Sequence, residues 1–152
     1  MKKITDYRKL LGVQENTTLE DLKSIYRGLM KTWHPDKFND DAEKKHEAEE
    51  MSKRVIEAYH FLVSIAPETR AATLDQFNAT INSSFIVDFD YKNQILQINF
   101  LDGHSYEFFG VPKPIYIKLV NADAAGRFAR RHIYNSYVYR SVSKIAATAQ
   151  PQ

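Results

Sequence analysis

Cysteine is absent from this chain of 152 residues. Its absence excludes disulfide bonds, thiol nucleophiles, iron–sulfur clusters and cysteine zinc sites, so any metal would depend on histidines and carboxylates. Long apolar runs are also missing, because the longest, Phe61 to Ala66, is far shorter than the roughly 20 residues of a membrane-spanning helix. We therefore expect a soluble protein of a reducing compartment, the cytoplasm, that uses no cofactor and contacts no membrane.

Charge divides the chain into two different halves. With 43% apolar and 26% charged side chains, the chain has the composition of a folded protein with one ordinary core or two small ones. Basic and acidic side chains balance over residues 1–65, whereas Asp123 is the sole acidic residue of the segment 113–144. The basic residues of that segment are Lys113, Lys118, Arg127, Arg130, Arg131, Arg140 and Lys144.

Helical signals dominate the first half. Thr5 or Asp6 can cap a short helix that ends at Gly12 in a left-handed conformation. Thr18 can cap a second helix, whose apolar side chains recur at helical spacing: Leu22, Tyr26, Leu29 and Trp33. Basic side chains recur every four residues on another face of this helix: Lys23, Arg27 and Lys31.

Pro35 marks the end of the second helix, because proline disfavours helical geometry at the preceding His34. After a loop of about eight residues, Asn39-Asp40-Asp41 can open a third helix. Its apolar side chains are Met51, Val55, Ala58, Tyr59 and Leu62. Two helices joined by so short a loop should pack antiparallel, with the loop exposed at one end. A short fourth helix can follow at 67–76.

Several segments of this half occur in an order and at a spacing that belong to one family. They are Asp6-Tyr7, Leu10-Leu11-Gly12-Val13, Leu22-Lys23, Tyr26-Arg27, Leu29, Trp33-His34-Pro35-Asp36-Lys37, Ala58-Tyr59, Leu62, Pro67-Glu68 and Arg70. In this pattern the half resembles the J-domain, the module of DnaJ co-chaperones. We assign residues 1–76 to an all-α J-domain, an antiparallel helical hairpin with short helices.

The resemblance implies a co-chaperone, not an enzyme, that binds a DnaK-type 70-kDa heat-shock chaperone and stimulates its ATP hydrolysis. Asp36 can accept hydrogen bonds from an arginine of the partner, Pro35 fixes the turn and His34 orients it. Basic side chains would steer the module to an acidic surface. The expected chaperone-binding residues are His34, Pro35, Asp36, Lys23, Tyr26, Arg27, Lys31 and Lys37. The alternative is that the triplet only ends a helix and that the lysines are a solvated face.

Some positions depart from the family pattern. Gly28 and Thr32 stand where basic residues are usual, and Ser52 stands where an aromatic core residue is common. We expect these departures to affect affinity or partner choice without altering the His-Pro-Asp turn. If they weaken the basic side of the helix enough, the chain would be a J-like scaffold without a chaperone partner.

The apolar period changes to two in the second half, as is typical of strands. The expected strands carry the alternating sets Phe85-Val87-Phe89, Leu96-Ile98-Phe100 and Tyr106-Phe108. A turn at 90–93 and a three-residue loop around Asp102-Gly103 predict an antiparallel β-meander with the second and third sets on one face. Helices after Pro112 and Asp123 would cover that face. We expect a small α+β domain at 85–142, preceded by a linker at 77–84 and followed by a flexible tail at 143–152.

The second half also carries a family pattern. Its residues are Ser84, Leu96, Ile98, Phe100, Gly103, Tyr106, Phe108, Gly110-Val111-Pro112, Tyr116, Leu119, Ala122, Gly126, Phe128, Ile133, Tyr137 and Tyr139. They resemble the KTSC domain, whose function is poorly defined and for which nucleic-acid binding has been suggested. Residues that could hold phosphates and stack unpaired bases, or dock a partner, are Arg127, Arg130, Arg131, Tyr137, Tyr139 and Arg140. Two interpretations remain open: the second half binds a client or partner protein, or it is an RNA-binding module tethered to a J-domain.

Enzymatic motifs are not evident in either half. The pairs His34 with Asp36 and His46 with Glu50 lack a third convergent ligand in the sequence. Neither a glycine-rich phosphate loop nor a nucleophile motif is present. We therefore expect neither a catalytic site nor a metal site.

Overall fold

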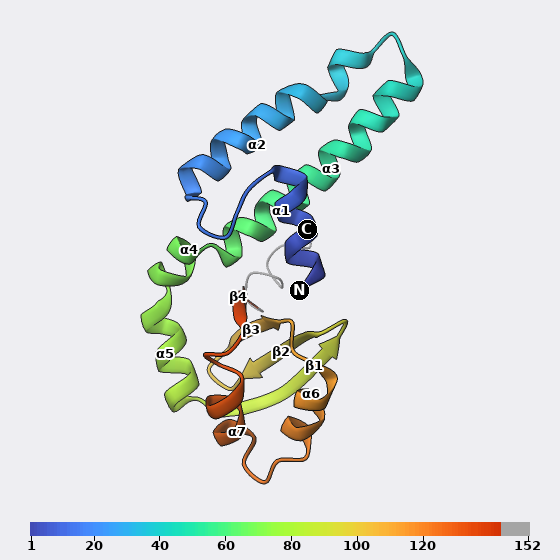
Figure 1. The fold of residues 1–152 in the computed structure, drawn as a ribbon. Coiled ribbons are helices and arrows are strands. Elements are labelled where there is room, and N and C mark those ends of the chain that lie inside the picture. The colour runs from blue at the N-terminus through green and yellow to red at the C-terminus, as the bar shows by residue number, and fades with distance from the viewer. Residues whose placement is uncertain (144–152) are drawn as a thin grey trace. The chain divides into compact units, whose positions relative to one another are not determined.

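The computed structural model describes residues 1–143, which form two compact units divided between Ala71 and Ala72 (Figure 1). The first unit is helical, and the second combines an antiparallel sheet with helices, which confirms the expected fold class. The predicted flexible tail at 143–152 lies outside the described residues, apart from Ser143. Over the described part of the chain, no helix is both long and apolar enough to cross a membrane.

The helices of the first unit are α1 (Lys2–Leu11), α2 (Leu19–Trp33), the 3-10 turn η1 (Pro35–Phe38), α3 (Ala42–Ile65) and α4 (Pro67–Ala72). Two of them, α2 and α3, begin at residues whose side chains cap them. The Thr18 hydroxyl accepts a hydrogen bond from the Asp21 N–H at 3.1 Å and so caps α2. Asp41 caps α3 through its carboxylate. Gly12 follows α1 with φ of 70°, a left-handed conformation that glycine adopts without a steric penalty. The predicted roles of Thr18 and Gly12 are confirmed, and Asp41 is the N-cap within the run Asn39-Asp40-Asp41 that was predicted to open the third helix.

The start of α1 differs from the prediction. The helix begins at Lys2, so Thr5 and Asp6 lie inside it and do not cap it. The Thr5 hydroxyl instead donates to the Met1 carbonyl at 3.1 Å. The helix extends further toward the N-terminus because Ile4 is buried in the core of the unit, and this packing outweighs the local capping preference.

α2 and α3 form the predicted antiparallel hairpin, with η1 at its tip (Figure 1). The Tyr26 ring stacks on the Tyr59 ring, with centroids 4.0 Å apart and planes 11° apart. The start of α2 is tied to α4, because the Leu19 N–H donates to Glu68 Oε1 at 3.0 Å. The hairpin is therefore braced at the end opposite the His-Pro-Asp turn.

The sheet of the second unit has the strand order β1-β2-β3-β4, with all neighbours antiparallel. The strands are β1 (Ile86–Lys92), β2 (Ile95–Phe100), β3 (His104–Phe109) and β4 (Val138–Ser143). The expected three-residue loop, residues 101–103, joins β2 to β3 and places Ile98 opposite Tyr106 on the core face. β4 adds a strand to the expected meander and pairs Tyr139 with Phe108.

β1 departs from the predicted alternation. Phe85 and Val87 were predicted to lie on the face of Phe89, but their exposed fractions are 76% and 55%. The register of β1 against β2 shifts after Ile86, which is the signature of a bulge. The shift allows Ile86 and Phe89, three residues apart, both to pack against the core.

The turn between β1 and β2 is also shorter than predicted. β1 continues to Lys92, and the turn consists of Asn93 and Gln94, whose φ values are 52° and 63°. Two positive φ values are characteristic of the two-residue turns that match the twist of a hairpin. The Gln94 carbonyl accepts hydrogen bonds from the N–H groups of Gly110 and Val111 at 2.9 and 3.0 Å, which stabilises this conformation.

Helices α6 (Lys113–Val120) and α7 (Ala125–His132) cover the core face of the sheet, as predicted. Leu119 of α6 and Ala129 of α7 are fully buried in that core. Asp123 does not cap α7, because the N-cap residue is Ala124 and no side chain bonds to the first turn. The N-terminal end of α7 is therefore left without a side-chain acceptor.

The segment 77–84 is not a linker but forms most of helix α5 (Leu74–Ser83). Phe77, Thr80 and Ile81 have exposed fractions of 1%, 1% and 7%, and Phe77 stacks on Tyr139 with ring centroids 3.9 Å apart. The linker prediction was wrong because the polar residues of this segment occupy only the outer side of a helix. α5 therefore belongs to the core of the second unit.

A hydrogen-bonded cluster ties α5 to the loop between β2 and β3. The Thr80 hydroxyl donates to Asp102 Oδ2 at 2.8 Å, and the His104 N–H donates to Asp102 Oδ1 at 3.0 Å. The Ser84 hydroxyl accepts from the Asp102 N–H at 3.0 Å, and Gln76 bonds to the His104 ring. Because these bonds join the helix to a distant loop, they fix α5 on the sheet.

Replacing Phe77 by alanine tests the corrected boundary. We expect the second unit to lose about 3–5 kcal/mol of unfolding free energy, because a fully buried ring is removed. Amide hydrogen exchange of β2 and β3 measures this loss. Fluorescence of Trp33, the single tryptophan, reports on the first unit and should be unchanged. Leu74→Ala, on the same helix but 44% exposed, is the matched control. A loss no larger than the control's would contradict the placement of α5.

Asp102 predicts how the second unit responds to acid. Burial favours a higher pKa for its carboxyl, but the hydrogen bonds from the His104 N–H and the Thr80 hydroxyl hold the pKa below its ordinary value of 3.8. A pKa that is lower in the folded state contributes stability above about pH 4, and this contribution is lost as the pH falls further. As the pH falls from about 5 to 3, the amides of β3 should lose protection from hydrogen exchange less steeply in Asp102→Asn than in the parent protein. Equal slopes for both proteins would contradict this role.

Candidate functional site

His34, Pro35 and Asp36 form the turn at the tip of the hairpin. Pro35 opens η1, and the His34 ring caps it, because the Asp36 N–H donates to His34 Nδ1 at 3.3 Å. His34 Nδ1 also lies 3.6 Å from Asp36 Oδ2. Since Nδ1 accepts the backbone hydrogen bond, it carries no proton in this arrangement, and the longer contact is not an ion pair. His34 therefore orients the turn, and the turn positions the Asp36 carboxylate.

The Asp36 carboxylate is exposed on this turn. The side chain of Asp36 is 80% exposed and that of His34 is 54% exposed. Within the described chain, no arginine or lysine pairs with this carboxylate. An exposed carboxylate on a capped turn is suited to accept charge-assisted hydrogen bonds from a guanidinium group of another molecule.

Ser52 holds the base of the same turn. Its hydroxyl donates to the carbonyl of Trp33, the last residue of α2, at 2.8 Å, and Ser52 is 7% exposed. Carbonyls in the last turn of a helix lack partners within the helix, so Ser52 satisfies one of them and joins α2 to α3. The sequence showed Ser52 only as a departure from a core aromatic. The signal that could have indicated this role is the position of Ser52, a small polar residue between Ala48 and Val55, both of which are buried on α3.

A basic face, defined as Lys23, Arg27, Lys31 and Lys37, lies on α2 and η1. All four side chains are exposed, and none pairs with an acidic residue of the described chain. A side chain at Gly28 would meet no atom within 4 Å of its Cβ. The basic face therefore has fewer cations than the family pattern because glycine occupies position 28, although a longer side chain would fit there.

Tyr26 lies differently from the other expected chaperone-binding residues. It is half-buried, and its ring stacks on Tyr59 of α3. The ring thus contributes to the packing of the hairpin beneath the basic face.

The residues expected to bind RNA or a partner in the second half do not form one surface. Tyr139 is 6% exposed beneath Phe77, so its ring is not available to stack on a base. Arg140 donates to Glu107 Oε1 through Nε at 2.9 Å and Nη2 at 2.5 Å. Tyr137 packs against the core. The expected combination of stacking rings and free arginines is therefore not assembled.

The arginines of α7 line two pockets. Arg127 and Arg130 line a cavity beside the end of α5, and Arg127 also lines a second pocket with Arg131, Phe128 and His132. Tyr134 lines the same cavity as Arg127 and Arg130.

Metal-binding geometry is not present in the part of the chain that the structure describes. No three histidine or acidic side chains gather there closely enough to hold an ion. His46 and Glu50, the second pair considered from the sequence, are both exposed on α3.

Two domain families match the chain. The DnaJ domain matches residues 6–72 and the KTSC domain matches residues 82–137. Over 59 residues the chain is 48% identical to "DnaJ homolog subfamily B member 6" of Gallus gallus, covering 39% of this chain and 17% of that protein. Over 65 residues it is 48% identical to "Chaperone protein DnaJ" of Thermoplasma volcanium, covering 43% of this chain and 16% of that protein. The chain thus spans less than a quarter of the length of these relatives.

The matched segments agree with the structural units. The DnaJ match contains α2, η1 and α3 and ends at the boundary between the units, and the KTSC match contains β1 to β3, α6 and α7. Most of α5 and all of β4 lie outside the KTSC match. Both resemblances found in the sequence are confirmed. The chain therefore combines a DnaJ-family J-domain with a KTSC domain.

Proposed function

We propose that this protein is a cytoplasmic J-domain co-chaperone, which binds a DnaK-type 70-kDa heat-shock chaperone and stimulates its ATP hydrolysis without catalysing a reaction itself. The observation that carries the proposal is the exposed Asp36 carboxylate on a turn capped by His34. A rigid turn loses little conformational entropy on binding. A carboxylate that pairs with no arginine or lysine of its own chain can accept two parallel hydrogen bonds from a guanidinium group of another molecule.

The basic face supports the same proposal. Its four cations have no acidic partner among the described residues, so they are available to an acidic surface. Opposite charges on two proteins mainly increase the rate of association and select the orientation of docking. The basic face would therefore guide the encounter, and Asp36 would make the specific contact.

We assign the second unit to binding a client or a partner protein. The RNA-binding alternative receives less support, because Tyr139 is buried and Arg140 is already bound to Glu107. Base stacking needs rings that are open on at least one side.

His34→Gln tests the role of the turn. We expect this variant to lose stimulation of single-turnover ATP hydrolysis by a DnaK-type chaperone, because the glutamine lacks the rigid ring that caps η1. Asp36→Asn should give the same loss, since it keeps the backbone N–H that bonds to His34 but removes the carboxylate charge. Circular dichroism and the melting temperature should stay at their parent values for both.

His46→Gln is the matched control, because His46 is exposed on α3 and lies outside the turn. It should stimulate ATP hydrolysis as the parent does. Full stimulation by folded His34→Gln would refute the proposed function.

Arg27→Glu tests the basic face. We expect its association rate with the chaperone at low salt to fall about tenfold, and the dependence of that rate on salt to weaken. Stopped-flow binding at several ionic strengths measures both quantities. Lys9→Glu, an exposed change on α1, is the control. A parent-like rate for Arg27→Glu would remove the basic face from the mechanism.

A further inference from the structure

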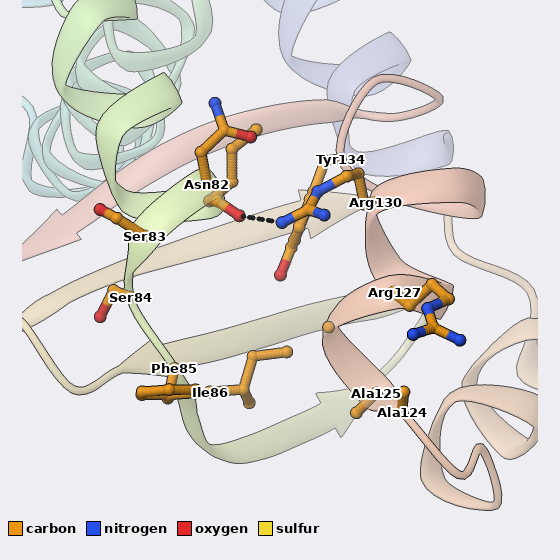
Figure 2. Close-up of a pocket in the computed structure, with 12 residues that line it drawn as sticks. Asn82, Ser83, Ser84, Phe85, Ile86, Ala124, Ala125, Arg127, Arg130 and Tyr134 are labelled. Carbon is orange, nitrogen blue, oxygen red and sulfur yellow. Dashed lines mark hydrogen bonds between the residues drawn. The ribbon is translucent and has the colours of Figure 1, made fainter.

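A cavity of about 560 Å³ opens in the second unit between the end of α5, the start of β1 and the N-terminal end of α7 (Figure 2). Its size is in the range of sites for small ligands. Ile81 and Ile86 supply apolar lining, and Phe85, 76% exposed, stands at its rim. An exposed aromatic ring beside an apolar surface favours a ligand with an apolar or aromatic portion.

The Tyr134 hydroxyl is directed into this cavity. Tyr134 is 2% exposed, yet it lines the cavity, and Figure 2 shows its hydroxyl among the labelled lining residues. This hydroxyl is not one of the fully buried polar atoms that lack a hydrogen-bond partner, so it faces the open space of the cavity. Burial raises the pKa of Tyr134 to about 12, so the hydroxyl keeps its proton at neutral pH and can donate it to an acceptor.

Arg130 places positive charge near this hydroxyl. Arg127 and Arg130 both line the cavity, and no acidic residue does. The Arg130 guanidinium is held in place, because its Nη2 donates to the Ile81 carbonyl at 3.3 Å, as the dashed line in Figure 2 shows. The Arg130 guanidinium is thus positioned by the end of α5 and can donate to an anion, whereas the Arg127 side chain points away from Tyr134 in Figure 2.

The N-terminal end of α7 adds backbone donors on the same side. Ala124 is the N-cap residue, no side chain caps the helix and its first turn has no acidic residue. The first N–H groups of a helix have no partners within the helix, and its dipole favours an anion there. Gly126 in this first turn lines the cavity, and even a Cβ at that position would meet no atom within 4 Å. The backbone is therefore open to close approach by a ligand.

We propose that this cavity binds the phosphate group of a small phosphate monoester, with the apolar part of the ligand against Ile86 and Phe85. A phosphate has enough acceptor oxygens for the Tyr134 hydroxyl, the Arg130 guanidinium and the N–H groups of α7. The proposal concerns the second unit alone and does not depend on the co-chaperone function.

Titration of the ¹⁵N-labelled full chain with phenyl phosphate at about pH 7.5 tests the proposal. We expect saturable shifts of the Gly126 and Arg127 amides, with a dissociation constant of roughly 1 mM. Inorganic phosphate should shift the same amides with weaker binding, because it lacks the apolar portion. Absence of saturable shifts at these amides up to about 20 mM phenyl phosphate would overturn the proposal.

Variants distinguish specific binding in the cavity from non-specific attraction of anions to arginine side chains. Tyr134→Phe keeps the buried ring and removes the hydroxyl, and it should weaken binding about three- to tenfold. Arg130→Gln should weaken binding at least tenfold. Arg131→Gln, on the same helix but outside the cavity, should bind as the parent does. Equal losses for Arg130→Gln and Arg131→Gln, or parent affinity in Tyr134→Phe, would overturn the proposal.

An RNA oligonucleotide provides the last comparison. A single strand without terminal phosphates should not displace phenyl phosphate, because its internal phosphodiesters lack the doubly charged group for which the cavity has donors. Displacement by this oligonucleotide at micromolar concentration would show that the arginines serve a nucleic-acid surface and would overturn the assignment to a small monoester.

Discussion

Pro35 imposes the constraint on which the first unit depends. Its ring fixes φ and removes a backbone donor, so α2 ends at Trp33 and the chain turns. The end of a helix leaves backbone groups without partners, and here the His34 ring accepts the Asp36 N–H while the Ser52 hydroxyl bonds to the Trp33 carbonyl. Because the backbone of the turn is satisfied from within, the Asp36 carboxylate remains available to another molecule.

The second unit follows from a sheet with one core face. Three helices cover that face, and α5 is held on it by the stacking of Phe77 and by the bond from Thr80 to Asp102. Where α5 ends and α7 begins, the apolar packing is incomplete and leaves a cavity with Tyr134 at its inner side. The same packing that stabilises the fold therefore creates a positively charged site that no strand or helix makes alone.

Several errors of the sequence analysis share one physical cause. The segment 77–84 contains polar residues at a density typical of a linker, but Phe77 and Ile81 are four residues apart and meet a core that local composition does not reveal. In β1, strict alternation placed Phe85 and Val87 inward, and a bulge after Ile86 reversed this. In both segments, packing against distant residues outweighed the local pattern.

The sequence by itself determined the helical hairpin, the position of the His-Pro-Asp turn and the three-residue loop that ends at Gly103, because caps, proline and apolar periodicity act within a few residues. Only the tertiary structure decided which arginines and tyrosines come together. Arg130 reaches the Ile81 carbonyl across 49 residues, while Tyr139, close to it in sequence, is buried beneath Phe77. Such contacts depend on how helices pack on a sheet, and neither residue spacing nor composition encodes which distant residues will meet.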